Sequence, residues 1–349
     1  MRATGANMLT AYGDLGLRVF STCPQSTDLT ADAYLKKVQE IARWSEDAGC
    51  EGILVYTDNA QVDPWLTSQA IITATRSLCP LVAIQPVYMH PYSVAKMISS
   101  LAFLHGRRVY LNMVAGGFPT DLAALNDRTP HDERYTRLAE YTAIIQGLLQ
   151  SAGPFSYDGK YYQVQNLRLT PPLPSELLPG ILMSGSSEAG TQAARSLGAL
   201  PIEYPKPVAE YAPAPPGSGA ARGLRVGLIT RDTETEAWRD AHARFPSDRK
   251  GQLAHELAMK VSDSSWHRQL SKLGANGAAA ERNPYWLVPF QNSKTFCPYL
   301  VGSYPTVAQE IAGYFGAGYR TFILDIPSSA EELRHTGIVF GLAVDRLAA

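Results

Sequence analysis

Polar side chains stand at the ends of apolar stretches that are typical of buried strands. The ends of such strands point toward ligands in barrel enzymes, so these side chains are candidates for binding and catalysis. Asn112 is the clearest, because an amide inside VYLNMVAG must find hydrogen-bond partners or destabilise the fold. A core polar group that is bonded within the protein is the alternative for each. The set comprises Cys23, Thr57, Gln85, Asn112, Ser184, Tyr204 and Arg225.

A serine- and glycine-containing turn, SGSS, joins an apolar stretch to a helix-like segment. It consists of Ser184, Gly185, Ser186 and Ser187. Backbone N–H groups and the dipole at a helix N-terminus suit a phosphate, whereas plain N-capping is the alternative. His131 and Tyr135 lie one turn apart at the start of another predicted helix, so both could hydrogen-bond a shared anion. A helix cap is the alternative for His131.

The sequence lacks the motifs that indicate several kinds of catalytic site. His90, His105 and His131 lack metal-ligand spacing, so we expect no metal. No strand end carries a lysine for a Schiff base, and no G-x-S-x-G motif occurs. With no obvious nucleophile or carboxylate pair, we expect a cofactor to carry the chemistry.

The overall charge excludes some partners. The 31 basic and 32 acidic residues give a net charge of −1, which argues against nucleic acid or an anionic membrane as the main partner. No apolar run is long enough to span a bilayer, and the N-terminus does not resemble a secretory signal. The 4 cysteines are widely spaced and fit no disulfide framework. These features predict a soluble, cytoplasmic protein.

Strand-like and helix-like stretches alternate along the 349 residues. The predicted strands are continuous apolar runs, as in a parallel sheet that is buried on both faces. They are Leu17–Pro24, Glu51–Asp58, Leu81–Val87, Val109–Ala115, Ile181–Ser184, Ala199–Tyr204, Leu224–Thr230 and Tyr319–Ile326. Helices follow nearly all of them, and Ser328 with Glu331 forms a capping box on the last helix. The pattern predicts an α/β fold, a TIM (β/α)8 barrel with insertions, rather than a doubly wound sheet.

The alternation breaks at three places. Residues 151–180 contain a hairpin signal with Asp158 and Gly159 as the turn, and a proline-rich stretch replaces the sixth helix. The largest insertion follows strand 7 and covers residues 231–302. We expect it to overhang the active-site end of one barrel domain, residues 1–349, as a lid. An oligomer contact is the alternative for its polar helices.

The chain resembles the bacterial luciferase-like, flavin-dependent monooxygenases, particularly the alkanesulfonate monooxygenase branch. The resemblance extends from about residue 17 to 347. It depends on the order of the segments EGILVYTD, VDPWL, LNMVAGGF, HDERYTRLAEYT, YDGKYYQV, SGSSEAGTQAA, RDTETEAW and LVGSYPTVAQEIAGYFGAGYRTFILD. It implies a cytoplasmic two-component enzyme that takes reduced FMN from a separate NAD(P)H:flavin reductase and activates O2 as a flavin hydroperoxide. We also expect a homodimer or homotetramer.

The resemblance assigns roles by position. It implies that the FMN phosphate binds at His131, Tyr135 and the serines of the SGSS turn, and that Thr57, Asn112 and Gln85 lie beside the flavin ring. Arg225 matches a catalytic arginine of the sulfonate enzymes, and Lys294 lies near the position of another basic group. We also expect Asn112 in catalysis, with Tyr204 and Cys23 on the substrate side.

Four departures from the sulfonate enzymes leave the substrate open. Gln61 stands in place of a cysteine, Gly227 of a histidine, Ile326 of a tyrosine and Tyr204 of a tryptophan. The expected activity is therefore oxygenation of a small organic molecule, either sulfonate- or sulfone-like or an apolar or aromatic natural-product intermediate. A hydride-transfer enzyme that uses deazaflavin or flavin, and a non-catalytic flavin-binding barrel, are the alternatives.

Overall fold

The structure is a computed structural model that describes residues 9–185, 187–215, 222–261, 269–271, 273 and 283–347. Ser186 of the predicted phosphate turn lies outside these residues, as do parts of the predicted lid (262–268, 272 and 274–282). No helix in the described ranges is both long and apolar enough to cross a membrane.

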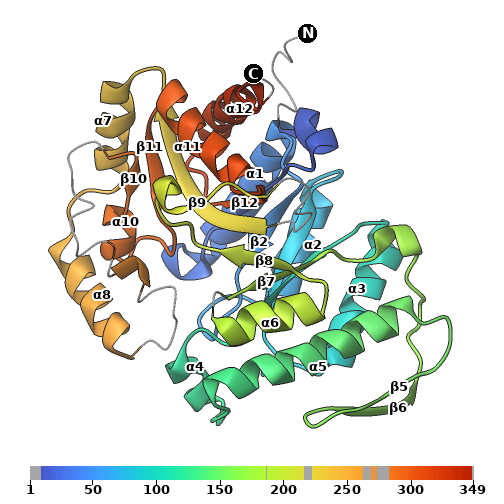
Figure 1. Ribbon diagram of the computed structural model, residues 1–349. Helices are drawn as coiled ribbons and strands as arrows, with labels where there is room; N and C mark the ends of the chain where they lie inside the picture. The colour runs from blue at the N-terminus through green and yellow to red at the C-terminus, as the bar shows by residue number, and fades with distance from the viewer. Residues whose placement is uncertain are drawn as a thin grey trace. The chain divides into compact units, whose positions relative to one another are not determined.

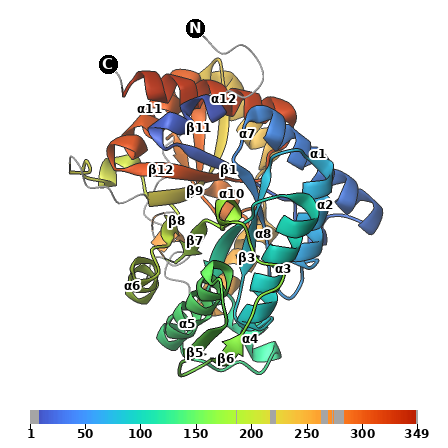
Figure 2. The same cartoon turned by 90° about the vertical axis from the view of Figure 1, so that its right-hand side faces the viewer.

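Eight parallel strands confirm the predicted (β/α)8 barrel with insertions. Each predicted strand is present, with ends shifted by a few residues. The strands are β1 (Arg18–Thr22), β2 (Gly52–Val55), β3 (Cys79–Ile84), β4 (Tyr110–Val114), β7 (Ile181–Ser184), β8 (Leu200–Glu203), β9 (Arg222–Arg231) and β12 (Tyr319–Leu324). Figure 1 labels β2, β7, β8, β9 and β12 of this set, and Figure 2 labels β1 and β3.

The helices follow the strands as predicted, and α4, α10 and α11 are additional. They are α1 (Ala31–Ala48), α2 (Pro64–Ala74), α3 (Pro91–His105), α4 (Pro119–Ala124), α5 (His131–Gln150), α6 (Glu188–Ser196), α7 (Glu234–Arg244), α8 (Arg249–Val261), α10 (Val288–Gln291), α11 (Tyr304–Gly316) and α12 (Ala330–Asp345). The predicted capping box is wrong by one residue. Ser329, not Ser328, is the N-cap of α12 and accepts a hydrogen bond from the N–H of Glu332.

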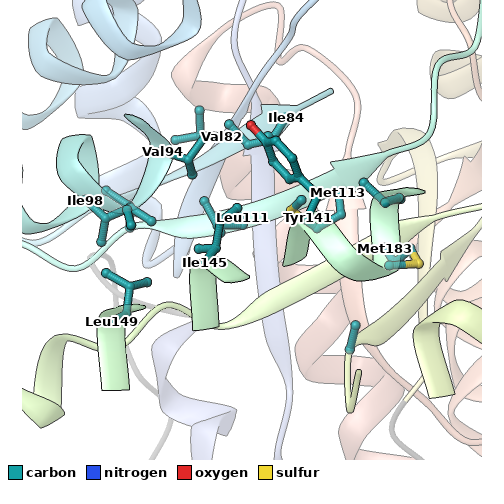
Figure 3. Packing of buried hydrophobic residues seen from close by; sticks show 14 of the residues in the cluster. Val82, Ile84, Val94, Ile98, Leu111, Met113, Tyr141, Ile145, Leu149 and Met183 are labelled. Carbon is teal, nitrogen blue, oxygen red and sulfur yellow. The ribbon is translucent and has the colours of Figure 1, made fainter. Parts of the chain in front are cut away.

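The chain divides into two compact units. The second unit comprises residues 23–42 and 52–201 and contains β2, β3, β4 and β7. Side chains from one face of β3 and β4 pack against α3 and α5, among them Val82, Ile84, Leu111 and Met113 (Figure 3). Because side chains alternate along a strand, the intervening Ala83 and Asn112 face the barrel interior.

The hairpin β5 (Phe155–Asp158) and β6 (Gln163–Leu167) also belongs to the second unit. Its strands are antiparallel, and the N–H of Gly159 donates to the carbonyl of Tyr162 across the turn. The hairpin signal at Asp158 and Gly159 is therefore confirmed.

The first unit comprises residues 1–22, 43–51 and 202–349, as far as they are described. Strand β9 pairs with β8 and β12 through its first half and with β11 (Tyr299–Ser303) through its second half. The short strand β10 (Tyr285–Trp286) pairs with β11, so part of the predicted insertion continues the sheet. Helices α11 and α12 lie side by side (Figure 2).

Aromatic packing sets the direction of the side chains on β9. Phe322 of β12 contacts Phe315 of α11 and Phe340 of α12, so it faces the helices. Leu224 pairs with Phe322 and shares its face, whereas Arg225 pairs with Ile323 one position later. Arg225 therefore faces the barrel interior.

Candidate functional site

A pocket of about 550 Å³ lies in the second unit, at the carboxyl ends of β2 and β3. Two predicted flavin-binding residues, Thr57 and Gln85, are part of its wall. The lining residues are Thr57, Asp58, Asn59, Gln61, Asp63, Pro64, Trp65, Ala83, Ile84, Gln85, Tyr88, Met89 and Leu125. Its volume and its mixture of apolar and amide groups are typical of a small-molecule site.

Gln85 and Thr57 are in direct contact. The Nε2 of Gln85 donates to the backbone carbonyl of Thr57 at 3.3 Å, and Gln85 is only 6% exposed. Within the described part of the chain, the Gln85 Oε1 and the Thr57 hydroxyl have no hydrogen-bond partner. This oxygen is not sealed in the core, because Gln85 lines the pocket, so it is available to a ligand that donates a hydrogen bond.

Asn112 and Ser184 are brought together by the pairing of β4 with β7. The Ser184 hydroxyl donates to Oδ1 of Asn112 at 2.8 Å, and Asn112 is 6% exposed. The Nδ2 of Asn112 has no acceptor among the described residues, so it can donate to a ligand in the barrel interior.

The predicted phosphate site is built around Tyr135. A Cβ atom added to Gly185 would lie 2.5 Å from the Tyr135 hydroxyl, so only glycine permits this close approach. Ser187 is the N-cap of α6 and accepts from the N–H of Gly190 at 3.1 Å. The ring of His131 packs edge-on against Tyr135 at 5.3 Å. The structure thus gathers the described members of this set at the start of α6.

Cys23 follows β1 and is buried. Its N–H donates to the carbonyl of Leu54 at 2.8 Å, and its side chain is not part of the pocket lining. Burial raises the pKa of the Cys23 thiol far above its usual value, so the group is neutral. A neutral buried thiol can form an apolar wall, but it is not an activated nucleophile.

Tyr204, Arg225 and Asp325 meet in the first unit. Arg225 lies on the inner half of β9, Tyr204 follows β8, and Asp325 follows β12. An Arg225 nitrogen lies 3.6 Å from Oδ1 of Asp325, and both side chains are about nine-tenths buried. Burial raises the pKa of Tyr204, while the charge of Arg225 and a hydrogen bond from it oppose this rise.

Asp325 is held by further hydrogen bonds. Its Oδ2 accepts from the hydroxyls of Thr295 at 2.6 Å and Tyr299 at 2.8 Å. The Tyr299 ring covers Gly227, where an added Cβ would lie 2.3 Å from the ring. Asp325 and Tyr299 were not predicted from the sequence, although a carboxylate directly after the buried stretch TFIL is the same kind of signal as the other strand-end residues.

The structure also places three positions that were compared with the sulfonate enzymes, namely Lys294, Gln61 and Ile326. Lys294 is half exposed and forms an ion pair with Asp248 at 2.8 Å. Gln61 lines the pocket, and its Oε1 accepts from the N–H of Ser26 at 2.7 Å. Ile326 offers its carbonyl to Arg244 at 2.6 Å.

Comparison with known proteins matches the chain to monooxygenases, both by a family model and by a single relative. The family model described as luciferase-like monooxygenase matches residues 17–321. A monooxygenase of Niallia circulans named "4-(gamma-L-glutamylamino)butanoyl-[BtrI acyl-carrier protein] monooxygenase BtrO" is 33% identical over 308 residues, which cover 86% of this chain and 89% of the relative.

Two solved structures illustrate the shared fold. EDTA monooxygenase from Chelativorans sp. BNC1 superposes with a TM-score of 0.69 at 18% identity, covering 95% of this chain and 94% of the other. DmoA from Hyphomicrobium sulfonivorans superposes with a TM-score of 0.65 at 17% identity, covering 95% and 88%. At this level of identity the superpositions support the barrel fold.

Proposed function

Because the chain belongs to the luciferase-like monooxygenase family, we propose that it is an FMNH2-dependent monooxygenase that oxygenates a small organic substrate with O2. The observation that carries this proposal is a pair of amide atoms, on Gln85 after β3 and on Asn112 of the adjacent β4, that have no protein partner in the described part of the chain and are not sealed in the core. Gln85 Oε1 can accept and Asn112 Nδ2 can donate a hydrogen bond, a combination that suits the polar edge of a flavin ring.

The second unit supplies the proposed cofactor-binding groups. Thr57, Gln85 and Asn112 orient the ring, while Ser184 fixes the amide of Asn112 through its hydrogen bond. When bound, reduced FMN supplies the electrons that activate O2. The protein contributes orientation and the exclusion of water.

The phosphate of FMN is proposed to bind at the start of α6. Gly185 lets the chain pass close to Tyr135, and Ser187 lies at the positive end of the helix dipole. His131 and Tyr135 add hydrogen-bonding side chains at the start of α5. Ser186, which the sequence also predicts at this site, lies outside the described residues.

Arg225 and Tyr204 are proposed to act in oxygen transfer. Arg225 donates hydrogen bonds to oxygen as negative charge develops on it, and Tyr204 is held as a neutral donor by burial. Cys23 contributes a neutral side chain on the substrate side. The insertion of residues 231–302 is proposed to limit the access of water as a lid.

The partners follow from the same proposal. The enzyme receives reduced FMN from a separate NAD(P)H:flavin reductase, works in the cytoplasm and forms a homodimer or homotetramer. The Niallia circulans relative is named for an acyl group carried on an acyl-carrier protein. A carrier-bound acyl substrate is therefore a candidate to test beside free small molecules.

Oxygen consumption tests the proposal. Photoreduced FMN is mixed with the protein and with candidate substrates in an oxygen electrode, with and without catalase. We expect tight binding of reduced FMN, substrate-dependent oxygen uptake and little H2O2. Strictly anaerobic turnover would instead show a hydride-transfer enzyme, and substrate-independent conversion of all the oxygen to H2O2 would show a barrel that only binds flavin.

A further inference from the structure

We propose that Asp325 positions Arg225, and that the insertion of residues 231–302 holds Asp325 in turn. Thr295 and Tyr299 of this insertion are then positioning residues for the proposed oxygen transfer. The inference rests on the proposed function, because it adds the residues that orient the proposed catalytic arginine. All the residues that carry it belong to the first unit of the chain.

Arg225 contacts both a carboxylate and a phenol of the first unit. One of its guanidinium nitrogens lies 3.6 Å from Oδ1 of Asp325, and the two side chains are 9% and 8% exposed. Arg225 also donates a hydrogen bond to Tyr204. A buried cation is costly without a partner of opposite charge, so Asp325 stabilises Arg225 in the barrel interior. Because the guanidinium is planar and rigid, contacts along one edge also set the direction of its other N–H groups.

Asp325 is itself fixed by the insertion. Its Oδ2 accepts hydrogen bonds from the hydroxyls of Thr295 at 2.6 Å and Tyr299 at 2.8 Å. The N–H of Asp325 donates to the carbonyl of Val226 at 3.2 Å, next to Arg225 in the chain. The carboxylate therefore cannot rotate without breaking two buried hydrogen bonds, and its Oδ1 stays directed at Arg225.

The two hydroxyl donors are fixed by further contacts. The Tyr299 ring lies against Gly227, where an added Cβ would come 2.3 Å from the ring. The N–H of Gly227 donates to the carbonyl of Pro298 at 2.9 Å, which ties β9 to the residue before β11. The Thr295 hydroxyl accepts from the N–H of Cys297 at 3.3 Å. The insertion thus meets the barrel strand through buried, directional contacts.

This order is important for the proposed reaction. Hydrogen-bond donors stabilise a developing negative charge most when they already point at it, because no reorganisation is then needed. Loss of one hydroxyl on Asp325 leaves the ion pair with Arg225 but weakens the restraint on its direction. Oxygen should then be consumed without being transferred, while the binding of flavin is unaffected.

A small guanidinium compound tests the role of Asp325 without any flavin. The variant Arg225→Ala removes the atoms that ethylguanidinium would replace. We expect ethylguanidinium to bind to Arg225→Ala, and its Kd to rise at least about tenfold when Asp325→Asn is added, because the paired carboxylate is lost. Titration calorimetry gives both values. Absent binding to folded Arg225→Ala, or an equal Kd in the two proteins, would overturn the proposal.

The matched control adds Asp240→Asn to Arg225→Ala instead. Asp240 pairs with Arg231 and Arg239 in the same unit, so its loss removes a carboxylate at another place and should leave the Kd unchanged. Adding Tyr299→Phe to Arg225→Ala should raise the Kd of ethylguanidinium by about threefold, because one hydrogen bond to a charged group is lost. A Kd that does not change would show that Tyr299 has only a packing role.

The single variant Tyr299→Phe tests the insertion in the complete enzyme. It removes one donor to Asp325 and keeps the ring against Gly227. We expect reduced FMN to bind within about threefold of the wild type, while the share of oxygen released as H2O2 rises at least about threefold. Tyr304→Phe, which removes a hydroxyl bonded to His335 at 2.6 Å in the same unit, is the control and should stay coupled. Normal coupling in Tyr299→Phe would contradict the proposal.

Failure of the proposed function gives a different result. Wild-type protein that binds no reduced FMN, or that releases all the oxygen as H2O2, would refute that function, whereas the ethylguanidinium titrations would still decide the role of Asp325. Far-UV circular dichroism shows whether each variant is folded. If Arg225→Ala does not fold, the coupling of Tyr299→Phe decides the inference, since that variant keeps both charges of the ion pair.

Discussion

At the scale of single residues, the candidate site is recognised by polar side chains that belong to buried residues. Asn112 and Gln85 are each 6% exposed and keep one amide atom without a partner among the described residues. These two atoms are not sealed in the core, so they are open to a ligand. The residues therefore fit a bound ligand better than a purely structural role.

Replacing Arg225 should separate flavin binding from oxygen transfer. In Arg225→Ala we expect reduced FMN to bind within about threefold of the wild type, while most of the oxygen consumed appears as H2O2, because a donor to the developing negative charge is lost. Peroxide assays in parallel with the oxygen electrode measure this. Arg334→Met, which removes an exposed arginine paired with Glu331 on α12, is the control and should stay coupled. Normal coupling in Arg225→Ala would refute the role of Arg225.

The phosphate site can be tested by comparing FMN with riboflavin. The double variant Ser187→Ala with His131→Ala should weaken reduced FMN by about tenfold and leave reduced riboflavin nearly unchanged, since only FMN carries the phosphate. Ultrafiltration gives both affinities. Ser329→Ala removes the same kind of cap from α12 and serves as the control. An equal loss for both flavins would place the phosphate elsewhere.

The sequence identified some of these residues and missed others for a physical reason. Asn112 and Gln85 interrupt apolar strands, so their cost of burial is visible in the sequence itself. The role of Asp325 depends on Arg225, which lies far away in the chain and becomes its neighbour only through the pairing of β9 with β12. Tyr299 likewise gains its place through its contact with Gly227.

At the scale of elements, helix α5 is anchored by the loop before it. Asp127 accepts hydrogen bonds from Thr129 and forms an ion pair with Arg137 at 2.6 Å. Burial raises the pKa of Asp127, but the hydrogen bonds from Arg137 and Thr129 outweigh it and hold this pKa at about 2. The charged carboxylate therefore stabilises the fold wherever the pH lies above the unfolded pKa.

This contribution should disappear in acid. Asp127→Asn is expected to lower the free energy of unfolding by about 2 kcal/mol near neutral pH, and the difference from wild type should shrink as the pH falls from about 4 toward 2. Urea unfolding across this range measures it. Asp28→Asn, at an exposed aspartate, should change little at any pH. A difference that persists below pH 2 would contradict the assignment.

The sequence predicted which strands and helices are present better than it predicted the residues at which they begin and end. Continuous apolar runs identified most of the barrel strands because consecutive residues, and therefore both faces, are buried in β2, β3, β4 and β9. The capping box was misplaced from Ser329 to Ser328, since adjacent serines have equal capping propensity and the backbone chooses between them. Helix α11 (Tyr304–Gly316) was missed, because no element was assigned between the predicted insertion, which ends at residue 302, and the last predicted strand, which begins at Tyr319.

At the scale of the whole molecule, the net charge of −1 argues for local rather than long-range recognition of the flavin. A protein with almost no net charge does not concentrate anions by its overall field. The barrel was predictable from the alternation of strands and helices, whereas the predicted oligomer and the single-domain organisation remain predictions.

Salt should therefore affect flavin binding only slightly. We expect the Kd of reduced FMN to change less than about threefold between 50 and 500 mM NaCl, because short contacts at a helix N-terminus are weakly screened. Potassium chloride in place of sodium chloride controls for the cation. A tenfold or greater loss of affinity would indicate a broad basic surface that steers the flavin.

Strand β9 also has a consequence for enzyme engineering. Its first half carries Arg225 in the barrel, and its second half, from Gly227 onward, pairs with β11 of the insertion. The two halves are one unbroken strand. A graft of residues 231–302 from a relative with another substrate would therefore also shift the alignment of the arginine. Substrate range and oxygen coupling should be redesigned together, with β9 and β11 transplanted as one cassette.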